Sequence, residues 1–311
     1  MTPLWSEATG RQTDHLPRLA ATTVLLRPAS AGLEVFLVKR AHGSDFMGGA
    51  HVFPGGKTDA CDGDEAWRAR VHGDLPALLA RLEPTPGRPL EEGDALGAIV
   101  AAARELFEEA GVLLAVDAGG APVSLDGELE AARGRVHDDA TAFGPLLDAR
   151  GLRLDLSSLC YFAHWVTPSL ERRRFDARFF LARLPAGQEA RVDEAETVAG
   201  DWLSPEAALA AVAAGEMILP PPTLRTVEWL RGFADLPAAF AGARAASIAA
   251  ILPKVAQTED GVGVLLPWDA AYADAEGEDY LGAGQRADAS GAFGGSRIVM
   301  AEGRWRSLDR R

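Results

Sequence analysis

The chain has 311 residues, of which 31 are Lys or Arg and 45 are Asp or Glu, so its formal net charge is −14. This charge argues against a nucleic-acid-binding surface, which needs a basic footprint. Two cysteines give no disulfide framework, and no uncharged apolar run is long enough to cross a membrane. We therefore expect a cytoplasmic protein that does not enter membranes.

Strand and helix patterns alternate along the chain. Alternating or continuous apolar runs predict strands over residues 21–26, 34–39, 51–53, 159–166, 175–184, 198–203, 297–300 and 304–308. Helical periodicity predicts helices over residues 95–110, 205–214 and 223–233, and one more beyond residue 236. Residues 117–151 show weak helical periodicity and are expected to cover one end of the fold. The helix over 95–110 is predicted to have Asp94 as its N-cap and to end before Gly111.

The C-terminal half of the 95–110 helix carries three carboxylates on one face. Glu105, Glu108 and Glu109 are three and four residues apart, which places them side by side on a helix. Like charges at these spacings cost the helix about 0.2–0.5 kcal/mol per pair, and a hard divalent cation among the oxygens would turn that repulsion into binding energy. The alternative is a solvated acidic face, although apolar residues on both sides leave only a narrow charged seam.

Residues 104–112, RELFEEAGV, resemble the second half of the Nudix box, whose consensus is G-x5-E-x7-R-E-U-x-E-E-x-G-U, with U a bulky aliphatic residue. The first half of the box is similar to residues 53–57, FPGGK, with Gly56 as its first glycine. Asp62 stands where the family has its glutamate, and the Arg-Glu pair begins at Arg104, 34 residues after the position 70 that the consensus gives. We therefore interpret residues 63–95 as an insertion within the box.

This resemblance implies the α/β/α sandwich of the Nudix hydrolases, with a mixed sheet, insertions and a C-terminal extension. It implies hydrolysis of a phosphoanhydride with Mg²⁺ or Mn²⁺, held by Glu105, Glu108, Glu109 and the main-chain carbonyl of Gly55. The three glutamates are the candidate catalytic residues, and one of them or a loop acid would be the general base. Arg104 is expected to orient a box carboxylate and not to bind substrate.

A fourth acidic metal ligand is expected from a later loop. Many Nudix enzymes take such a ligand from a loop just ahead of a strand that contains a tryptophan. Glu196 lies six residues before Trp202 and is the candidate. Glu194 is its competitor, and an ordinary loop acid is the alternative for both.

The segment ahead of the box is similar to a signature found in coenzyme A diphosphatases, although Asp45 stands where that signature has its second arginine. The resemblance implies that Arg40, Phe53, Gly56 and Lys57 bind substrate. A guanidinium beside the glycine loop matches phosphate oxygens, and a surface salt bridge is the alternative for Arg40.

Residues 164–180 are similar to the subgroup that includes mammalian peroxisomal acyl-coenzyme A diphosphatases, whose members also carry an insertion inside the box. Arg173 and Arg174 lie within this stretch. They are candidate contacts for a substrate phosphate, and the alternative is a solvated charged loop between two strands.

The sequence thus predicts an enzyme that hydrolyses a small-molecule diphosphate, with coenzyme A or an acyl-coenzyme A as the first substrate hypothesis. ADP-ribose, a dinucleotide or a nucleotide sugar are alternatives, and a non-catalytic nucleotide-sensing module is the alternative of another class. We expect a hydrolase domain over residues 1–235, with insertions over 63–95 and 117–151, and an extension over 236–311 packed on or near it. The oligomeric state is open, a homodimer included.

Overall fold

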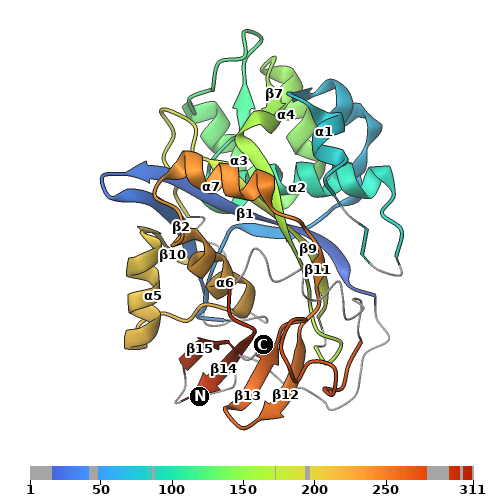
Figure 1. Ribbon diagram of the computed structural model, residues 1–311. Coiled ribbons are helices and arrows are strands. Elements are labelled where there is room, and N and C mark those ends of the chain that lie inside the picture. The colour runs from blue at the N-terminus through green and yellow to red at the C-terminus, as the bar shows by residue number, and fades with distance from the viewer. Residues whose placement is uncertain are drawn as a thin grey trace.

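The computed structural model describes residues 16–41, 48–82, 84–85, 88–171, 173–192, 197–278, 294–301 and 304–309. Within these residues a mixed sheet of eight strands forms the centre of the molecule (Figure 1). Its strands are β1 (Arg18–Ala29), β2 (Gly32–Arg40), β3 (His51–Val52), β4 (Gly55–Lys57), β8 (Leu159–Val166), β9 (Phe175–Arg183), β10 (Thr197–Leu203) and β11 (Ala250–Ile251). They follow the order β10-β2-β1-β9-β8-β11, with β3 paired to β2 and β4 paired to β1.

Helices and two smaller sheets surround this centre. The helices are α1 (Leu75–Leu79), α2 (Glu92–Ala110), α3 (Gly127–Asp138), α4 (Phe143–Ala149), α5 (Pro205–Ala214), α6 (Pro221–Leu230) and α7 (Leu236–Ala245). The 3₁₀ helices are η1 (Ala60–Gly63), η2 (Glu65–Ala69), η3 (Ala140–Ala142) and η4 (Leu156–Ser158). One small sheet contains β12 (Lys254–Thr258), β13 (Gly261–Leu265), β14 (Arg297–Ala301) and β15 (Arg304–Leu308), and the other contains β5 (Val71–His72), β7 (Arg153–Asp155) and β6 (Ala115–Val116).

Both faces of the central sheet are covered. Side chains alternate between the faces with the period of two that a strand imposes: in β1, Ala21 and Leu25 pack towards α2, whereas Val24 and Leu26 pack towards α5, α6 and α7. Burial on both faces explains why several strands are nearly uninterrupted apolar runs. Strand β1 runs parallel to β9 and antiparallel to β2. The predicted α/β/α sandwich with a mixed sheet is therefore confirmed.

Helix α2 is the buried helix of the sandwich. Most of its side chains between residues 95 and 110 are buried, and the hydroxyl of Thr23 on β1 donates to the carbonyl oxygen of Ala102 at 2.6 Å. A buried hydrogen bond between a strand and the middle of a helix fixes how far the helix can slide along the sheet. This contact and the apolar packing together hold α2 against the central sheet.

The helix begins before the predicted residue and ends at the predicted one. Glu91, in an extended conformation, is the N-cap, and the prediction of Asp94 as N-cap is wrong. Asp94 lies within the first turn, where a negative charge is stabilised by the helix dipole. An acidic residue near this end of the helix was therefore predicted correctly, but the residue that caps the helix was not. Gly111 ends the helix with a φ of 63°, in the left-handed region that glycine adopts without strain.

The two segments predicted to be insertions contain regular structure. Residues 63–95 hold η2, β5 and α1, and residues 117–151 hold α3 and α4. Nε of Arg133 on α3 donates to the carbonyl oxygen of Glu108 at 2.7 Å. The second insertion therefore covers the C-terminal end of α2, where the helix carbonyls lack partners within the helix.

The segment beyond residue 235 packs on the central sheet. Helix α7 lies against β8 and β1 and buries Phe240 among its apolar residues. Strand β11 extends the sheet by pairing parallel to β8. Val264 of β13 and Ile298 of β14 belong to the same apolar cluster as α5, α6 and α7. This segment therefore contributes to the core on one face of the sheet.

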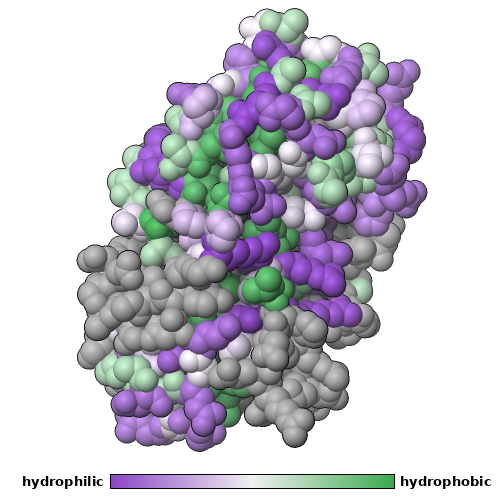
Figure 2. Space-filling model, turned by 90° about the vertical axis from the view of Figure 1, so that its right-hand side faces the viewer, coloured by the Kyte–Doolittle hydropathy of each residue, from purple (hydrophilic) through white to green (hydrophobic). Residues whose placement is uncertain are grey.

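The outer surface keeps most apolar groups covered. Among the large hydrophobic side chains of the described residues, Leu16 and Val262 are exposed. Figure 2 shows hydrophilic side chains over much of the coloured surface of one face, with hydrophobic ones between them. None of the described helices is long and apolar enough to cross a membrane.

A buried polar network joins the first insertion to the central sheet. Nη1 of Arg178 on β9 donates to Nδ1 of His164 on β8 at 2.8 Å, which places the ring proton on Nε2, 2.5 Å from the carboxylate of Asp176. Thr85, within the insertion, donates its hydroxyl to the same carboxylate. All four side chains are buried. Burial lowers the pKa of His164 and the charge of Arg178 adds to that effect, while Asp176 opposes it, so the ring is neutral.

The left-handed end of α2 gives a first prediction. Gly111→Ala is expected to lower the free energy of unfolding by about 1 kcal/mol, because a Cβ is strained at a φ of 63°. Gly134→Ala is the matched control: this exposed glycine lies inside α3 with nothing within 4 Å of an added Cβ, so alanine is expected to raise the free energy by about 0.5–1 kcal/mol. Urea unfolding followed by circular dichroism measures both, and changes of the same sign would contradict the assigned helix end.

The neutral His164 predicts a loss of stability on mild acidification. Because its pKa is lowered by folding, the unfolded chain binds a proton below about pH 6.5 that the folded protein does not bind. The contribution of this group is complete above that pH and falls as the pH drops below it, by at most about 1.4 kcal/mol per pH unit. The variant His164→Gln is expected to be less stable than the wild-type protein at pH 8. Between pH 7 and pH 5 it is expected to lose less free energy of unfolding than the wild-type protein loses. Urea titrations across this range test it, and identical slopes for both proteins would rule out a neutral His164.

Candidate functional site

A cavity of 960 Å³ opens between the C-terminal half of α2, the glycine loop at β4 and the end of α3. It continues over the sheet face that carries α6, along β1, β9 and β8. Small-molecule and cofactor sites have volumes of about 300–1,000 Å³. The cavity is lined by the box residues Gly55, Gly56, Glu105, Glu108 and Glu109. The structure thus brings the two halves of the predicted box together around one space.

The glycines of the loop lie between β1 and α2. Strand β4 pairs with β1 so that Gly55 faces Thr22, and a Cβ on Gly55 would lie 2.8 Å from the Cα of Thr22. A Cβ on Gly56 would overlap the carboxylate of Glu105. The amide of Gly55 donates to Oε2 of Glu109 at 2.9 Å. Residues without a side chain are therefore needed for the main chain to pass between the strand and the two carboxylates.

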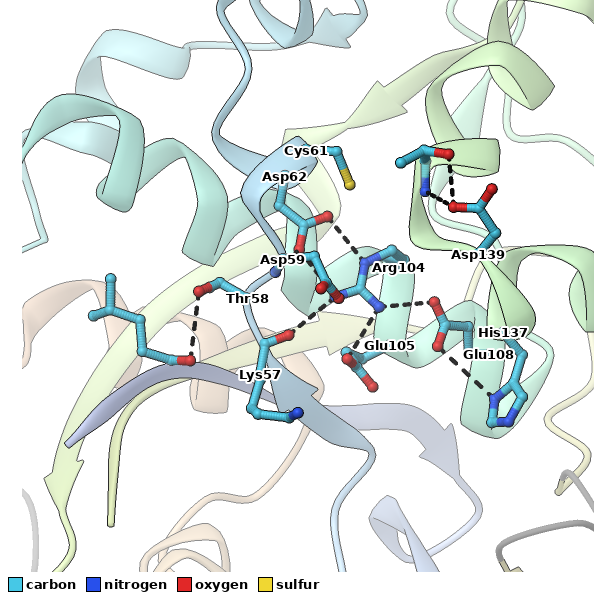
Figure 3. Close-up of polar contacts among 12 residues, drawn as sticks. Lys57, Thr58, Asp59, Cys61, Asp62, Arg104, Glu105, Glu108, His137 and Asp139 are labelled. Atoms are coloured by element: carbon cyan, nitrogen blue, oxygen red, sulfur yellow. Dashed lines mark hydrogen bonds and ion pairs between the residues drawn. The ribbon is translucent and has the colours of Figure 1, made fainter. Parts of the chain in front are cut away.

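Arg104 lies at the centre of the carboxylates (Figure 3). Its Nε and Nη2 donate to the two oxygens of Asp62, each at 2.9 Å, and its Nη1 donates to Glu108 at 2.8 Å and to Glu105 at 3.0 Å. Nη2 also donates to the carbonyl oxygen of Lys57 at 3.0 Å. The residue is 2% exposed. One buried guanidinium thus joins η1, β4 and α2, and it sets the direction of two box glutamates.

Asp62 reaches Arg104 because η1 lies very close to α2. A Cβ on Gly63 would lie 2.7 Å from the carbonyl oxygen of Gly93, in the first turn of α2. The main chain of η1 therefore approaches the helix as closely as glycine allows, and the short side chain of Asp62 spans the remaining gap. The sequence placed Asp62 at the glutamate position of the box without a partner, and the structure identifies that partner as Arg104.

Burial dominates the electrostatics of the cluster. It raises the pKa of Glu105 to about 8, an effect that Arg104 opposes and that the charges of Glu109 and Glu108 increase. Burial also raises the pKa of Glu108. Burial alone would lower the pKa of Arg104, but its hydrogen bonds to Asp62 and the charge of Glu105 raise it overall. Buried carboxylates that repel one another favour an added cation, because the cation offsets both costs.

The donor set fits a hard divalent cation. Carboxylates and a main-chain carbonyl are the oxygen ligands that Mg²⁺ and Mn²⁺ prefer. Within the described part of the chain, no three acidic, histidine or cysteine donors are already grouped as a metal site. Glu105 and Glu108 turn towards Arg104, and Glu109 turns towards the amide of Gly55. Cation binding would therefore require glutamate side chains to rotate.

The cavity is also lined by four of the predicted substrate contacts, Arg40, Phe53, Lys57 and Arg173. Arg174 is placed differently. It is buried and donates to the carbonyl oxygen of Thr167 at 3.1 Å and to Glu278 at 2.5 Å, so it holds a loop and does not line the cavity. Glu196 and Asp45 lie outside the described residues.

Several lining residues were missed by the sequence analysis. His137, at the end of α3, has Nδ1 4.0 Å from Oε2 of Glu108. Trp165 and Phe179 line the part of the cavity that lies over the sheet, and Pro253 lines it from the C-terminal segment. The strand patterns predicted β8 and β9, but no local signal indicates which strand face borders a cavity.

Known proteins are similar to this chain in sequence. A sequence profile of the NUDT19 Nudix domain matches residues 14–230. The chain is 33% identical over 285 residues to acyl-coenzyme A diphosphatase NUDT19 of Homo sapiens, which covers 82% of this chain and 76% of that protein. It is 31% identical over 286 residues to the protein of the same name from Gallus gallus, with 80% and 75% covered.

A solved structure is also similar. A Nudix hydrolase from Alicyclobacillus acidocaldarius aligns with a TM-score of 0.60 and 29% identity, over 74% of this chain and 97% of that one. The profile match extends over more than half of the chain and includes both halves of the split box. The chain therefore belongs to the NUDT19 Nudix domain family of the Nudix hydrolases.

Proposed function

We propose that this Nudix hydrolase cleaves the phosphoanhydride bond of coenzyme A or an acyl-coenzyme A, which yields 3′,5′-ADP and a 4′-phosphopantetheine product. The observation that carries the proposal is the cavity, in which the three box glutamates, the loop glycines and several cationic side chains surround one space. The relatives named acyl-coenzyme A diphosphatases support this choice of substrate.

The acidic cluster is proposed to be the catalytic centre. Hydrolysis needs water to attack one phosphorus in line with the departing phosphate, and negative charge grows on the oxygens as it does so. Mg²⁺ or Mn²⁺ would supply positive charge for these oxygens and would lower the pKa of the attacking water. We assign Glu105, Glu108, Glu109 and the carbonyl of Gly55 to holding the cation, with Glu196 as an additional ligand.

Arg104 is proposed to be a positioning residue. Its Nη1 holds Glu105 and Glu108, and its other donors are occupied by Asp62 and by the carbonyl oxygen of Lys57. A guanidinium so fully bonded has little capacity left for a phosphate. It acts by holding the two carboxylates in a fixed position beside the cavity until a cation binds.

Other cationic groups are proposed to bind the substrate. Nε of Arg40 is buried and has no hydrogen-bond partner within the described part of the chain, which suits a guanidinium that bonds a phosphate oxygen. Lys57 and Gly56 line the cavity next to each other, and both are proposed to bind the diphosphate, Lys57 through its ammonium group. Phe53 and Arg173 are proposed to contact the parts of the substrate beyond the diphosphate.

The proposed setting is a reducing compartment such as the cytoplasm. Cys61 and Cys160 are both free, Cys160 is buried, and burial raises the pKa of both thiols. A thiol with a raised pKa is mostly protonated and unreactive at neutral pH. The cysteines are therefore suited to remain as thiols in that compartment.

Loss of a box glutamate gives the third prediction. Glu108→Gln and Glu109→Gln are each expected to lower Mg²⁺-dependent turnover of coenzyme A by roughly a thousandfold or more, because a cation contributes several kcal/mol to transition-state stabilisation. Both variants are expected to fold, because amidation removes one charge from a repelling cluster. Glu92→Gln, on the exposed first turn of the same helix, is the matched control and is expected to keep full activity.

The same assay separates the alternatives. A panel of coenzyme A, acyl-coenzyme A, NADH, ADP-ribose and nucleotide sugars is offered with Mg²⁺ and with Mn²⁺. Full activity in both glutamine variants would sink the assignment of the metal site. Turnover of another compound with none of coenzyme A would replace the proposed substrate, and binding without turnover of any compound would indicate a nucleotide-sensing module.

The charge partners of Arg104 give the fourth prediction. Asp62→Asn is expected to lower the free energy of unfolding by about 1–3 kcal/mol, because it removes the buried carboxylate that bonds two guanidinium nitrogens. Asp59→Asn is the matched control. The side chain of Asp59 is 60% exposed and lies 3.5 Å from Nη2 of Arg104. Its replacement is therefore expected to lower the free energy of unfolding by less than about 1 kcal/mol. Chemical denaturation measures both, and equal losses would show that Asp62 is not a special partner.

A further inference from the structure

The cavity has two ends that differ in charge. The helical end, next to α3 and η1, is lined by Asp59, Asp138 and Asp139 in addition to the box. The sheet end lies over the central sheet and is lined by Trp165, Phe175, Ala177, Phe179, Pro253 and Val264. Among the described residues, Lys57 at the glycine loop and Arg173 are charged side chains that line the sheet end, and no carboxylate lines it. The two halves of a diphosphate substrate therefore meet different surroundings.

The register of the strands defines the floor of the sheet end. Lys57 on β4, Ala20 on β1, Ala177 on β9 and Trp165 on β8 occupy one row across the sheet. Residues in one row point to the same face, and strands lie about 4.8 Å apart, so the row extends about 14 Å from the glycine loop to Trp165. All four residues line the cavity. A substrate anchored at the loop by its diphosphate can therefore lie along this row.

Small and large side chains shape this floor into a slot. Ala177 leaves space above the sheet, whereas Phe175 and Phe179 follow on the same face at two residues to either side on β9. Trp165 lies beside Ala177 in the row. Ile251 of β11 pairs with Trp165 of β8, and Pro253 follows two residues later in the chain. Pro253 therefore lies close to Trp165 and closes the far side of the slot. The result is a slot with aromatic walls.

Arg173 lies at the mouth of this slot. It belongs to the loop between β8 and β9, two residues before Phe175, and it is exposed. The loop is anchored by two hydrogen bonds: the amide of Thr167 donates to the carbonyl oxygen of Phe175 at 2.9 Å, and the amide of Phe175 donates to Oγ1 of Thr167 at 3.0 Å. The buried Arg174 bonds the carbonyl oxygen of Thr167 as well. These bonds hold the two ends of the loop together, and Arg173 is exposed.

We infer that the adenosine 3′-phosphate half of the substrate occupies the sheet end, with adenine in the aromatic slot and the 3′-phosphate at Arg173. This inference rests on the proposed function. A base stacks on aromatic side chains with either face, and a guanidinium pairs with a phosphate through two hydrogen bonds. The acyl-pantetheine half carries no further phosphate and extends to the helical end, where Asp59, Asp138 and Asp139 would repel an additional anion.

Removal of the 3′-phosphate from the ligand tests the role of Arg173. In Arg173→Ala, kcat/KM for coenzyme A is expected to fall about tenfold, mainly through KM, whereas kcat/KM for 3′-dephospho-coenzyme A changes less than about twofold. Dissociation constants of 3′,5′-ADP and of 5′-AMP, measured by isothermal titration calorimetry, compare ligands with and without the 3′-phosphate in the absence of turnover. Arg231→Ala, which removes an exposed arginine at the end of α6, is the matched control. It is expected to leave kcat/KM unchanged for both coenzyme A and 3′-dephospho-coenzyme A.

Filling the slot tests which half of the substrate lies there. Ala177→Leu is expected to lower kcat/KM by one common factor for coenzyme A and for short-chain and long-chain acyl-coenzyme A, because all share the adenosine half. A loss that grows with acyl chain length would place the acyl group at the sheet end and overturn the inference. Equal losses for coenzyme A and its 3′-dephospho form in Arg173→Ala would also overturn it. A wild-type protein that binds 3′,5′-ADP through Arg173 but hydrolyses no coenzyme A would instead overturn the proposed function and leave the nucleotide site standing.

Discussion

The site depends on one buried cation, the guanidinium of Arg104. Removing a charge from water is costly unless each donor finds an acceptor, and here Asp62, Glu105, Glu108 and the carbonyl oxygen of Lys57 provide the acceptors. Displacement of η1, β4 or the second half of α2 would break a bond to a charge that water cannot reach. The three elements therefore behave as one unit, and the glycine loop stays in register with the glutamates.

The same interaction moderates the acidic cluster. Three glutamates within two turns of a helix, of which Glu108 and Glu109 are buried and Glu105 is partly buried, would destabilise the fold if nothing opposed their charge. Arg104 opposes part of it through Glu105 and Glu108, and the amide of Gly55 bonds Glu109. The remaining negative charge faces the cavity. The protein thus tolerates an acidic cluster at the edge of the cavity without unfolding around it.

The features that can be predicted from the sequence are those that local geometry decides. The spacing of Glu105, Glu108 and Glu109 on a helix follows from 3.6 residues per turn alone, and the left-handed end of α2 follows from the glycine at 111. Contacts between distant segments stayed beyond reach. Asp62 and Arg104 are 42 residues apart, and no periodicity links them.

Adjacency in the sequence also misled the assignment of the arginines. Arg173 and Arg174 are neighbours, and one role was expected for both. In extended chain, successive side chains point to opposite sides. Arg173 lines the cavity, whereas Arg174 is buried against Thr167 and Glu278. Which of two neighbours faces a site depends on the register of the strand that follows, and that register is a property of the whole sheet.

The contact between Gly63 and Gly93 explains how a split motif can work as a continuous one. The inserted segment begins at the end of η1 and ends at the first turn of α2, so its two ends lie next to each other. The cost of closing a loop rises only with the logarithm of its length. The free-energy cost of bringing the two halves of the box together therefore changes little with the number of residues between them.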